Sequence, residues 1–318
     1  MDDVKHRSVR TNGIDMHFVE AGAGPLVVLC HGFPELSYSW RHQVAALASA
    51  GYRAVAPDQR GYGDTSRPDD VQAYDIIHLT DDLLGLLDAL EEERAVFVGH
   101  DWGAPVVWNL ALRAPKRVRA VVGMSVPYVP RSERPPTEIW KAVFTDHWFY
   151  ILYFQEPGLA DADLGRDPAT TMRRFLCAIS GDGTGLGSLS GPRDGRGMVD
   201  RLPEPAGLPG WLTQEDVDHY AAVFARTGFT GGLNWYRNFD RNWELTAELA
   251  GARIEVPALF IAGTGDPVLR MVPPDRMGQW VTDLRGTLLL PGAGHWVQQE
   301  RPDEVNAALL GFLDEVPG

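Results

Sequence analysis

Short runs of apolar, mostly β-branched residues recur along the chain and predict buried strands. These runs cover residues 17–20, 26–30, 52–57, 96–98, 118–124, 256–262 and 286–290. Residues 75–90 carry apolar side chains at helical spacing with acidic side chains opposite, and residues 302–313 are expected to form a closing helix. Strands that alternate with helices imply a mostly parallel central sheet with helices on both faces. In such sheets the functional residues lie at the carboxyl ends of the strands.

The pattern changes between residues 130 and 243, where β-branched runs disappear and helical signals dominate. Trp, Tyr, Phe, Gly and Pro cluster in this segment. We therefore expect a helical cap, residues 130–243, inserted into a core domain formed by residues 1–129 and 244–318. Within the cap, residues 181–210 are dense in Gly and Pro, which predicts an extended surface connection.

Composition narrows the possible partners and the compartment. The chain has 318 residues, of which 29 are Lys or Arg and 43 are Asp or Glu, so its formal net charge is -14. This charge repels phosphate backbones and anionic lipids, which argues against nucleic-acid and membrane binding. The charged start has no apolar run after it, and no run is long enough to span a bilayer. Cys30 and Cys177 fit buried thiols of a cytoplasmic protein.

A sharp strand-to-helix corner is expected around Asp101, within Gly99-His100-Asp101-Trp102-Gly103. This is the pattern of a nucleophile elbow, with aspartate where most such elbows carry serine. A carboxylate needs no base to activate it, so it can attack an electrophilic carbon and form an alkyl ester. The motif alone leaves open that Asp101 only caps the following helix.

Two further loops complete a candidate triad. Asp266 and His295 each follow a late strand and are flanked by glycines. The order Asp101, Asp266, His295 is nucleophile, acid and base in an α/β-hydrolase. In this interpretation Asp266 orients the His295 ring and stabilises its charged form. The alternative for Asp266 is a simple turn former, and for His295 a solvated loop residue.

An irregular loop, His31-Gly32-Phe33-Pro34, follows the strand at residues 26–30. Its backbone N–H groups can point into a site because glycine and proline break the strand. We expect an oxyanion hole formed by the N–H groups of Phe33 and Trp102. His31 is interpreted as a structural hydrogen-bonding residue, since one base is enough.

Over nearly its whole length the sequence resembles the soluble epoxide hydrolases of the α/β-hydrolase superfamily. The resemblance rests on His31-Gly32-Phe33-Pro34, the Asp101 elbow, Gly294-His295 and two cap segments, residues 153–158 (YFQEPG) and residues 231–238 (GGLNWYRN). It implies an α/β-hydrolase fold with a cap, and it assigns Tyr153 and Tyr236 to hydrogen bonds with the epoxide oxygen. Packing inside the cap is the alternative for both tyrosines.

The chemistry of the residues agrees with this resemblance. Opening an epoxide with a carboxylate creates an alkoxide, which two phenols can protonate. His295 then activates water to hydrolyse the ester, so no cofactor and no metal ion is expected. Aromatic surroundings predict a small hydrophobic or aryl epoxide as substrate. The predicted pocket residues are Phe33, Pro34, Trp102, His147, Trp148, Trp235 and Trp296. The sequence leaves open whether the chain forms a homodimer.

Two other functions remain as alternatives. A haloalkane dehalogenase also uses an elbow aspartate, with Trp102 as one halide donor, but it needs a second N–H donor where this loop has Phe33. A non-catalytic ligand-binding protein would keep the cap and the pocket but lack a complete triad.

Overall fold

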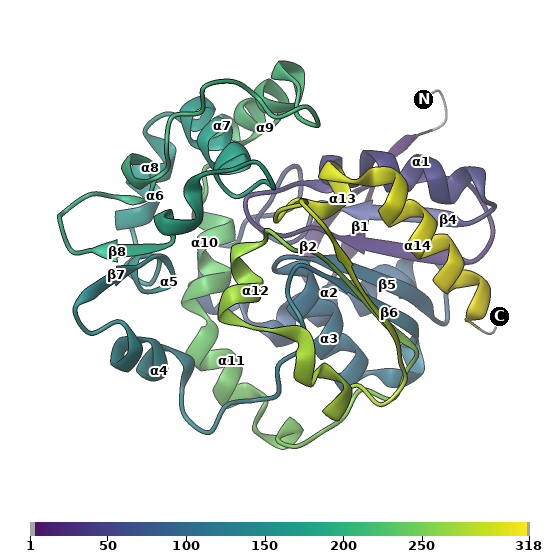
Figure 1. Cartoon of the computed structure of the whole chain (residues 1–318). Coiled ribbons are helices and arrows are strands. Elements are labelled where there is room, and N and C mark those ends of the chain that lie inside the picture. Colours follow the sequence, from purple (N-terminus) through teal and green to yellow (C-terminus); the bar gives the residue numbers. More distant parts are fainter. Residues whose placement is uncertain (1–3, 317–318) are drawn as a thin grey trace.

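The computed structural model describes residues 4–316, which form an eight-stranded sheet and a helical cap (Figure 1). The strand order in the sheet is β1-β2-β4-β3-β5-β6-β9-β10. Its strands are β1 (Lys5–Thr11), β2 (Ile14–Ala21), β3 (Leu26–Cys30), β4 (Arg53–Pro57), β5 (Ala95–His100), β6 (Val118–Met124), β9 (Ala258–Gly263) and β10 (Leu284–Leu290). Within the described part of this sheet, the β1–β2 and β2–β4 pairs are antiparallel and the other five pairs are parallel. The prediction of a mostly parallel sheet is therefore confirmed.

Helices cover both faces of the sheet, because alternate side chains of each strand point to opposite faces. On one face, α1 (Arg41–Ser49), α13 (Val297–Glu300) and α14 (Pro302–Glu315) bury Val96 and Val98 of β5. On the other face, α2 (Ile76–Ala89) and α3 (Gly103–Arg113) bury Phe97 of the same strand. The second of these apolar clusters continues into the cap, so the cap and that face of the core share one interior.

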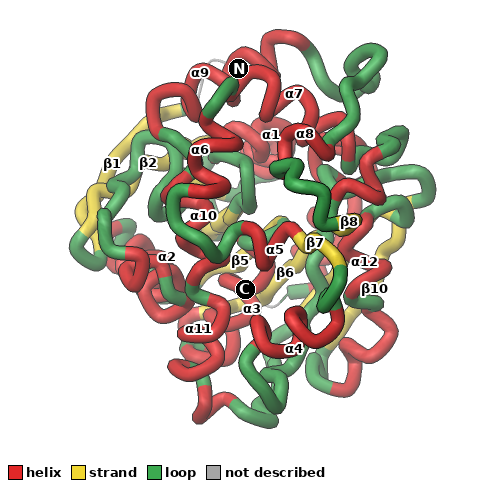
Figure 2. Tube along the Cα trace, turned by 90° about the vertical axis from the view of Figure 1, so that its left-hand side faces the viewer, coloured by secondary structure: helices red, strands yellow, loops and turns green. Residues whose placement is uncertain are grey.

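The cap lies between β6 and β9 in the chain and over the carboxyl ends of the parallel strands (Figures 1 and 2). Its helices are α4 (Pro136–Val143), α5 (Tyr150–Tyr153), α6 (Leu159–Gly165), α7 (Pro168–Ala178), α8 (Met198–Arg201), α9 (Gln214–Thr227), α10 (Thr230–Arg237) and α11 (Phe239–Leu245). A small hairpin pairs β7 (His147–Phe149) with β8 (Ser190–Pro192). The segment expected as the cap, residues 130–243, ends inside α11, and these domain boundaries stay a prediction.

The Gly- and Pro-rich segment is more structured than an extended surface connection. Residues 181–210 contain β8 and α8, and Met198 and Val199 of α8 are buried. The expectation of a purely extended connection is therefore wrong, because these two apolar side chains anchor the segment to the cap.

Short helical turns complete the architecture. They are η1 (Ser37–Trp40), η2 (Val71–Tyr74), η3 (Pro115–Arg117), η4 (Gly185–Ser188), η5 (Ala247–Leu249), η6 (Pro274–Gln279) and the α-helix α12 (Pro267–Met271). Across residues 4–316, no helix has the length and apolar character needed to cross a membrane.

Candidate active site

Asp101 occupies the corner between β5 and α3 with a left-handed backbone, φ 49°. Residues other than glycine rarely adopt this conformation, so its neighbours must hold it in place. A Cβ on Gly99 would overlap the Gly103 carbonyl, and one on Gly103 would overlap the Cys30 carbonyl. A Cβ on Gly32 would overlap the Asp101 carboxylate itself. The glycines of the elbow and of the Phe33 loop therefore allow the close packing that presents Asp101.

The structure brings the three predicted triad residues together. Nε2 of His295 lies 3.4 Å from Oδ2 of Asp101, and Nδ1 of His295 lies 3.0 Å from Oδ2 of Asp266. Asp266 also caps α12, since its Oδ1 accepts a hydrogen bond from the Val268 N–H at 2.8 Å. Asp266 and His295 are buried, whereas the Asp101 side chain retains 14% exposure. The carboxylate is thus the member of the triad that a substrate can reach.

The electrostatics of the triad favour a charged imidazole. Burial by itself lowers the pKa of His295, but the charge of Asp266 and the hydrogen bonds that the ring donates to Asp101 and Asp266 raise that pKa well above its ordinary value of 6.5. Part of this increase comes from the negative charge of Asp101. Any reaction that neutralises Asp101 therefore makes His295 a more available base.

One of the two predicted oxyanion donors contacts the nucleophile directly. The Phe33 N–H donates a hydrogen bond to Oδ1 of Asp101 at 2.7 Å. Trp102, the other predicted donor, is the N-cap residue of α3. The positive end of a helix dipole therefore lies beside Asp101, which favours negative charge there.

Sequence reasoning missed a buried network beneath the triad. Oε2 of Glu35 lies 2.6 Å from Nδ1 of His100, and Nε2 of His100 lies 2.7 Å from the His295 carbonyl oxygen. Oε2 of Glu35 also accepts a hydrogen bond from the Gly32 N–H at 3.0 Å. Through Glu35 and His100, the loop that carries Phe33 is therefore connected to the backbone of His295. Burial raises the pKa of Glu35, but the His100 charge and hydrogen bond outweigh this and lower it to about 2. Glu35 is the last residue of the HGFPE motif, and His100 directly precedes Asp101 in the GHD motif. Their positions beside the predicted site residues are the signal that could have revealed this pair.

A second missed residue, Glu300, holds the loop that carries His295. Its carboxylate accepts the backbone N–H groups of Gly181, Gly294 and Trp296 at 2.8, 2.9 and 3.0 Å. The His295 N–H donates to the Ile179 carbonyl at 2.9 Å. The loop of the base is therefore fixed to the start of the Gly-rich cap segment.

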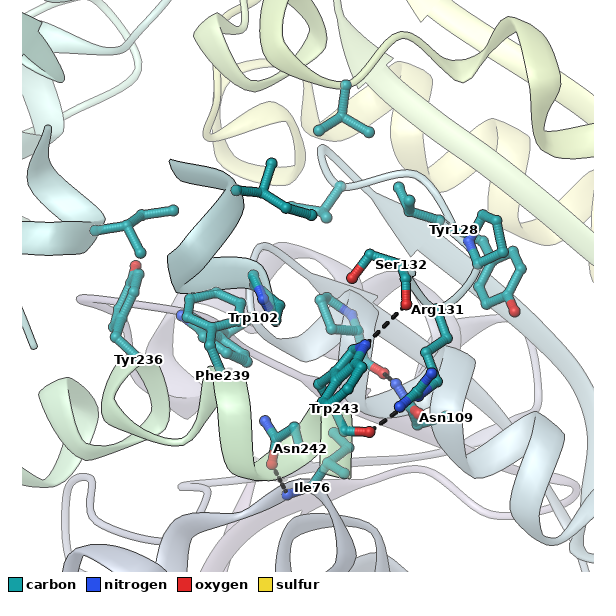
Figure 3. A pocket seen from close by; sticks show the side chains of 18 of the residues that line it. Ile76, Trp102, Asn109, Tyr128, Arg131, Ser132, Tyr236, Phe239, Asn242 and Trp243 are labelled. Carbon is teal, nitrogen blue, oxygen red and sulfur yellow. Dashed lines mark hydrogen bonds between the residues drawn. The ribbon is translucent and has the colours of Figure 1, made fainter. Parts of the chain in front are cut away.

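A cavity of about 460 Å³ has Asp101 among its lining residues. Figure 3 shows other residues of its wall, including Trp102 and Tyr236. Its walls are mostly apolar and come from the core helices α2, α3 and α12, from the cap helices α4, α5, α10 and α11, and from the loops beside them. Large apolar side chains in the wall that the sequence did not reveal are Ile139, Trp140, Phe149, Phe239 and Trp243. The shape and lining fit a small hydrophobic molecule.

Tyr236 lines this cavity as predicted, but Tyr153 does not. The Tyr153 hydroxyl lies 3.2 Å from Asp163 and its ring lies beside Trp148, at a centroid distance of 5.4 Å. Tyr150, one helical turn earlier in α5, lines the cavity instead and its ring centroid is 6.2 Å from that of Tyr236. The expectation that Tyr153 faces the cavity is therefore wrong, and Tyr150 lies beside Tyr236 in the cavity wall.

Most of the predicted pocket residues lie elsewhere. Of the seven, Trp102 lines the cavity, whereas Phe33, Pro34, His147, Trp148, Trp235 and Trp296 do not. The Trp235 and Trp296 indoles donate to the carbonyls of Arg60 and Leu176 at 3.0 and 2.9 Å, so they are core residues. The Trp148 ring lies under the Arg201 guanidinium, and His147 is exposed. Phe33 packs its ring against other aromatic rings, including Phe154 and Phe175.

Comparisons with known proteins agree with this geometry. A family model described as "alpha/beta hydrolase fold" matches residues 25–302. Epoxide hydrolase A of Mycobacterium tuberculosis is 58% identical over 96% of each chain. Bifunctional epoxide hydrolase 2 of Mus musculus is 41% identical over 98% of this chain and 56% of its own length. The crystal structure of epoxide hydrolase A from Mycobacterium thermoresistibile has 59% identity, 99% coverage of both chains and a TM-score of 0.95. The chain therefore belongs to the epoxide hydrolase family within the α/β-hydrolase fold.

Proposed function

We propose that this enzyme converts hydrophobic epoxides to vicinal diols through a covalent ester on Asp101. The observation that carries the proposal is a single apolar cavity lined by the exposed edge of Asp101 and by Tyr150 and Tyr236. One wall supplies a nucleophile, and the cap supplies two phenols that can act on the leaving oxygen.

In the first step, Oδ2 of Asp101 attacks an oxirane carbon and the bond from that carbon to the epoxide oxygen breaks. Burial and the negative charge of Asp101 raise the pKa of both Tyr150 and Tyr236. Both phenols are therefore protonated at neutral pH and available as hydrogen-bond donors to the developing alkoxide. One of them transfers its proton to that oxygen, which becomes the first hydroxyl of the diol.

In the second step, the ester on Asp101 is hydrolysed by water. Ester formation removes the negative charge of Asp101, which lowers the pKa of His295. The charged ring then loses its proton through solvent to the phenolate left by the first step, and the neutral ring can accept a proton from water. The resulting hydroxide attacks the ester carbon, and the negative charge develops on Oδ1, which the Phe33 N–H already binds at 2.7 Å. We assign the Trp102 N–H as the second donor. Collapse breaks the bond between the acyl carbon and Oδ2, and Oδ2 leaves as the second hydroxyl of the diol with the proton from His295. The carboxylic acid that remains on Asp101 gives its proton to His295, which restores the starting pair of charges.

A labelling experiment tests this order of bonds. A single turnover of styrene oxide in heavy-oxygen water should place the label in the peptide that contains Asp101, measured by mass spectrometry. The first diol molecules should then contain no label. Label that appears directly in the diol of a single turnover would contradict an ester intermediate, because water would have attacked the epoxide itself.

The haloalkane dehalogenase alternative lacks support at the donor positions. A halide ion needs a second N–H donor besides that of Trp102, whereas Phe33 has no side-chain donor and phenols line the facing wall. Incubation with a haloalkane should release no halide under conditions where styrene oxide gives diol.

A further inference from the structure

The cap segment YFQEPG, residues 153–158, supplies no phenol to the cavity wall. Its one tyrosine, Tyr153, has its hydroxyl 3.2 Å from Asp163 and does not line the cavity. The next two residues, Phe154 and Gln155, instead contact the structure around both tyrosines that do line it. The segment therefore acts on the site through residues other than its tyrosine.

The Gln155 side chain joins the two segments that carry Tyr150 and Tyr236. Its amide nitrogen donates one hydrogen bond to the Ile151 carbonyl at 2.9 Å and a second to the Tyr236 carbonyl at 3.0 Å. Ile151 directly follows Tyr150 in α5. Both partners are carbonyl oxygens, so only the nitrogen of the amide, which carries two hydrogens, can bind them. One atom therefore links the backbones beside both phenols.

Both carbonyls lie near helix ends, where acceptors lack partners inside the helix. The helix α5 is a single turn, Tyr150–Tyr153, and a helix this short is not stable on its own. In a longer helix the Gln155 backbone N–H would bind the Ile151 carbonyl, but it donates to the Leu152 carbonyl at 3.3 Å. The Gln155 side chain binds Ile151 in its place, so the position of α5 depends on this side chain.

A second connection between these segments runs in the opposite direction. Arg237, which directly follows Tyr236 in α10, donates from Nε to the Phe154 carbonyl at 3.2 Å. Its guanidinium forms a largely buried ion pair with Asp161, which fixes the direction of the side chain. The ends of α5 and α10 are thus connected twice, once from each side.

The Phe154 ring fills the space between the two phenol rings. It is fully buried, and its centroid lies 5.6 Å from that of Tyr150 and 5.0 Å from that of Tyr236. Both contacts are edge-to-face, with interplanar angles of 90° and 82°. The ring keeps the two tyrosines from moving closer together, while the Gln155 hydrogen bonds keep their backbones from moving apart.

We propose that Gln155 is a positioning residue for ring opening, because its amide holds Tyr150 and Tyr236 at the separation at which both hydroxyls bind one epoxide oxygen. This role rests on the proposed function, in which both phenols act on the developing alkoxide. Ester hydrolysis instead uses His295 and the Phe33 N–H, which belong to the core and not to α5 or α10. Loss of the link should therefore slow the first step and leave the second step unchanged.

Quenched single turnovers of styrene oxide, with the ester on Asp101 quantified by mass spectrometry, measure both steps. Gln155→Leu removes both hydrogen bonds and should slow ester formation about 10- to 100-fold, because a displacement of about 1 Å is enough for such a loss. Gln155→Glu has the same size but places an oxygen against the two carbonyls, so it should slow the same step if Gln155→Leu does not fold. Gln214→Leu is the matched control, since this exposed glutamine of cap helix α9 binds Asp218 and should affect neither step.

A double-mutant cycle separates positioning from a general loss of cap structure. In Tyr150→Phe a single phenol remains, so its separation from a second hydroxyl no longer matters. Tyr236 itself stays in place, because the Trp235 indole of α10 donates to the Arg60 carbonyl of the core at 3.0 Å. Gln155→Leu should therefore slow ester formation far less in the Tyr150→Phe background than in the wild type.

Three results would overturn the proposal. They are ester formation that is unchanged in both Gln155 variants, equal slowing of ester formation and ester hydrolysis, and equal effects of Gln155→Leu in the two backgrounds. Wild-type protein that forms no ester on Asp101 would instead refute the proposed function.

Discussion

Tyr150 and Tyr236 are the side chains that face the epoxide oxygen in the proposed reaction. Replacing either with Phe should slow ester formation by about 10²- to 10⁴-fold, because the alkoxide then loses a proton donor. Tyr153→Phe is the matched control, since its hydroxyl contacts Asp163 and lies outside the cavity. Single-turnover kinetics measure the rate. A larger loss in Tyr153→Phe than in Tyr150→Phe would restore the role to Tyr153.

The charge on Asp101 controls the proton affinity of the base. In Asp101→Asn the pKa of His295 should fall, because the Asp101 charge and hydrogen bond both raise it in the wild type. NMR titration of the imidazole measures this shift. A pKa of His295 that is equal in both proteins would show that Asp266 alone sets it.

The same shift has a consequence for stability. A histidine with a raised pKa in the folded state contributes stability below its ordinary pKa of 6.5, and this contribution is lost as pH rises through the folded pKa. The unfolding free energy of the wild type should therefore decline above pH 6.5 relative to that of His295→Gln. Urea unfolding at several pH values measures the difference. Parallel profiles would mean that the unfolded state shares the raised pKa.

Residue types and loop positions predicted the triad but not the second tyrosine. Asp101, Asp266 and His295 each follow a strand, so the parallel sheet itself brings them to one edge. Tyr150 and Tyr153 lie in one short helical turn, and Tyr153 contacts Asp163 and Trp148, which no local sequence pattern reveals. The tryptophans of the cap are equally suited to core and cavity, so composition could not separate these two environments.

At the scale of elements, the short helix α13 links the base to the cap through Glu300. Glu300→Gln should lower the unfolding free energy by about 1 to 3 kcal/mol, because one amide oxygen cannot accept all three N–H groups. Hydrolysis of the ester should slow more than its formation, since the His295 loop is the part released. Denaturant unfolding and single-turnover kinetics measure the two effects.

Glu304→Gln gives a matched control for this substitution. Glu304 forms a surface ion pair with Arg301 at the start of α14, and such pairs contribute at most about 1 kcal/mol. Equal destabilisation by both substitutions would contradict the role of Glu300 in holding the loop.

The elements also differ in how well the sequence predicted them. Buried strands such as β3 and β5 have continuous apolar runs, whereas β1 reads KHRSVRT and is mostly exposed. Its strand conformation comes from pairing with β2 from Lys5 to Thr11, which no local pattern reveals. Hydrogen bonding to a neighbour, and not its own side chains, defines this edge strand.

At the scale of the molecule, the cap is joined to the core by buried polar contacts. The Tyr220 hydroxyl of α9 lies 2.7 Å from the Ser39 hydroxyl and 3.2 Å from Oε1 of Gln299. Asp216 of the same helix binds Tyr38 and Arg41 at 2.8 and 3.0 Å. Because an apolar cluster also crosses this boundary, cap and core should unfold as one cooperative unit.

Tyr220→Phe tests the strength of this junction. The substitution should lower the unfolding free energy by about 1 to 2 kcal/mol, because two buried partners lose a hydrogen bond. Circular dichroism and tryptophan fluorescence in urea should give coincident transitions in the variant. Tyr52→Phe, whose hydroxyl has no partner among the described residues, is the control. Separate transitions for the two probes would show that the cap unfolds on its own.

The reacting groups and the cavity walls belong to different kinds of structure. Asp101 and His295 depend on backbone groups of tightly packed loops, whereas the walls are side chains of helices such as α4 and α11. Exchanging a wall side chain leaves those backbone groups undisturbed. Related sequences can therefore differ in substrate selectivity while they catalyse the same reaction. A mutant library confined to the two helices would sample new selectivities among folded, active proteins.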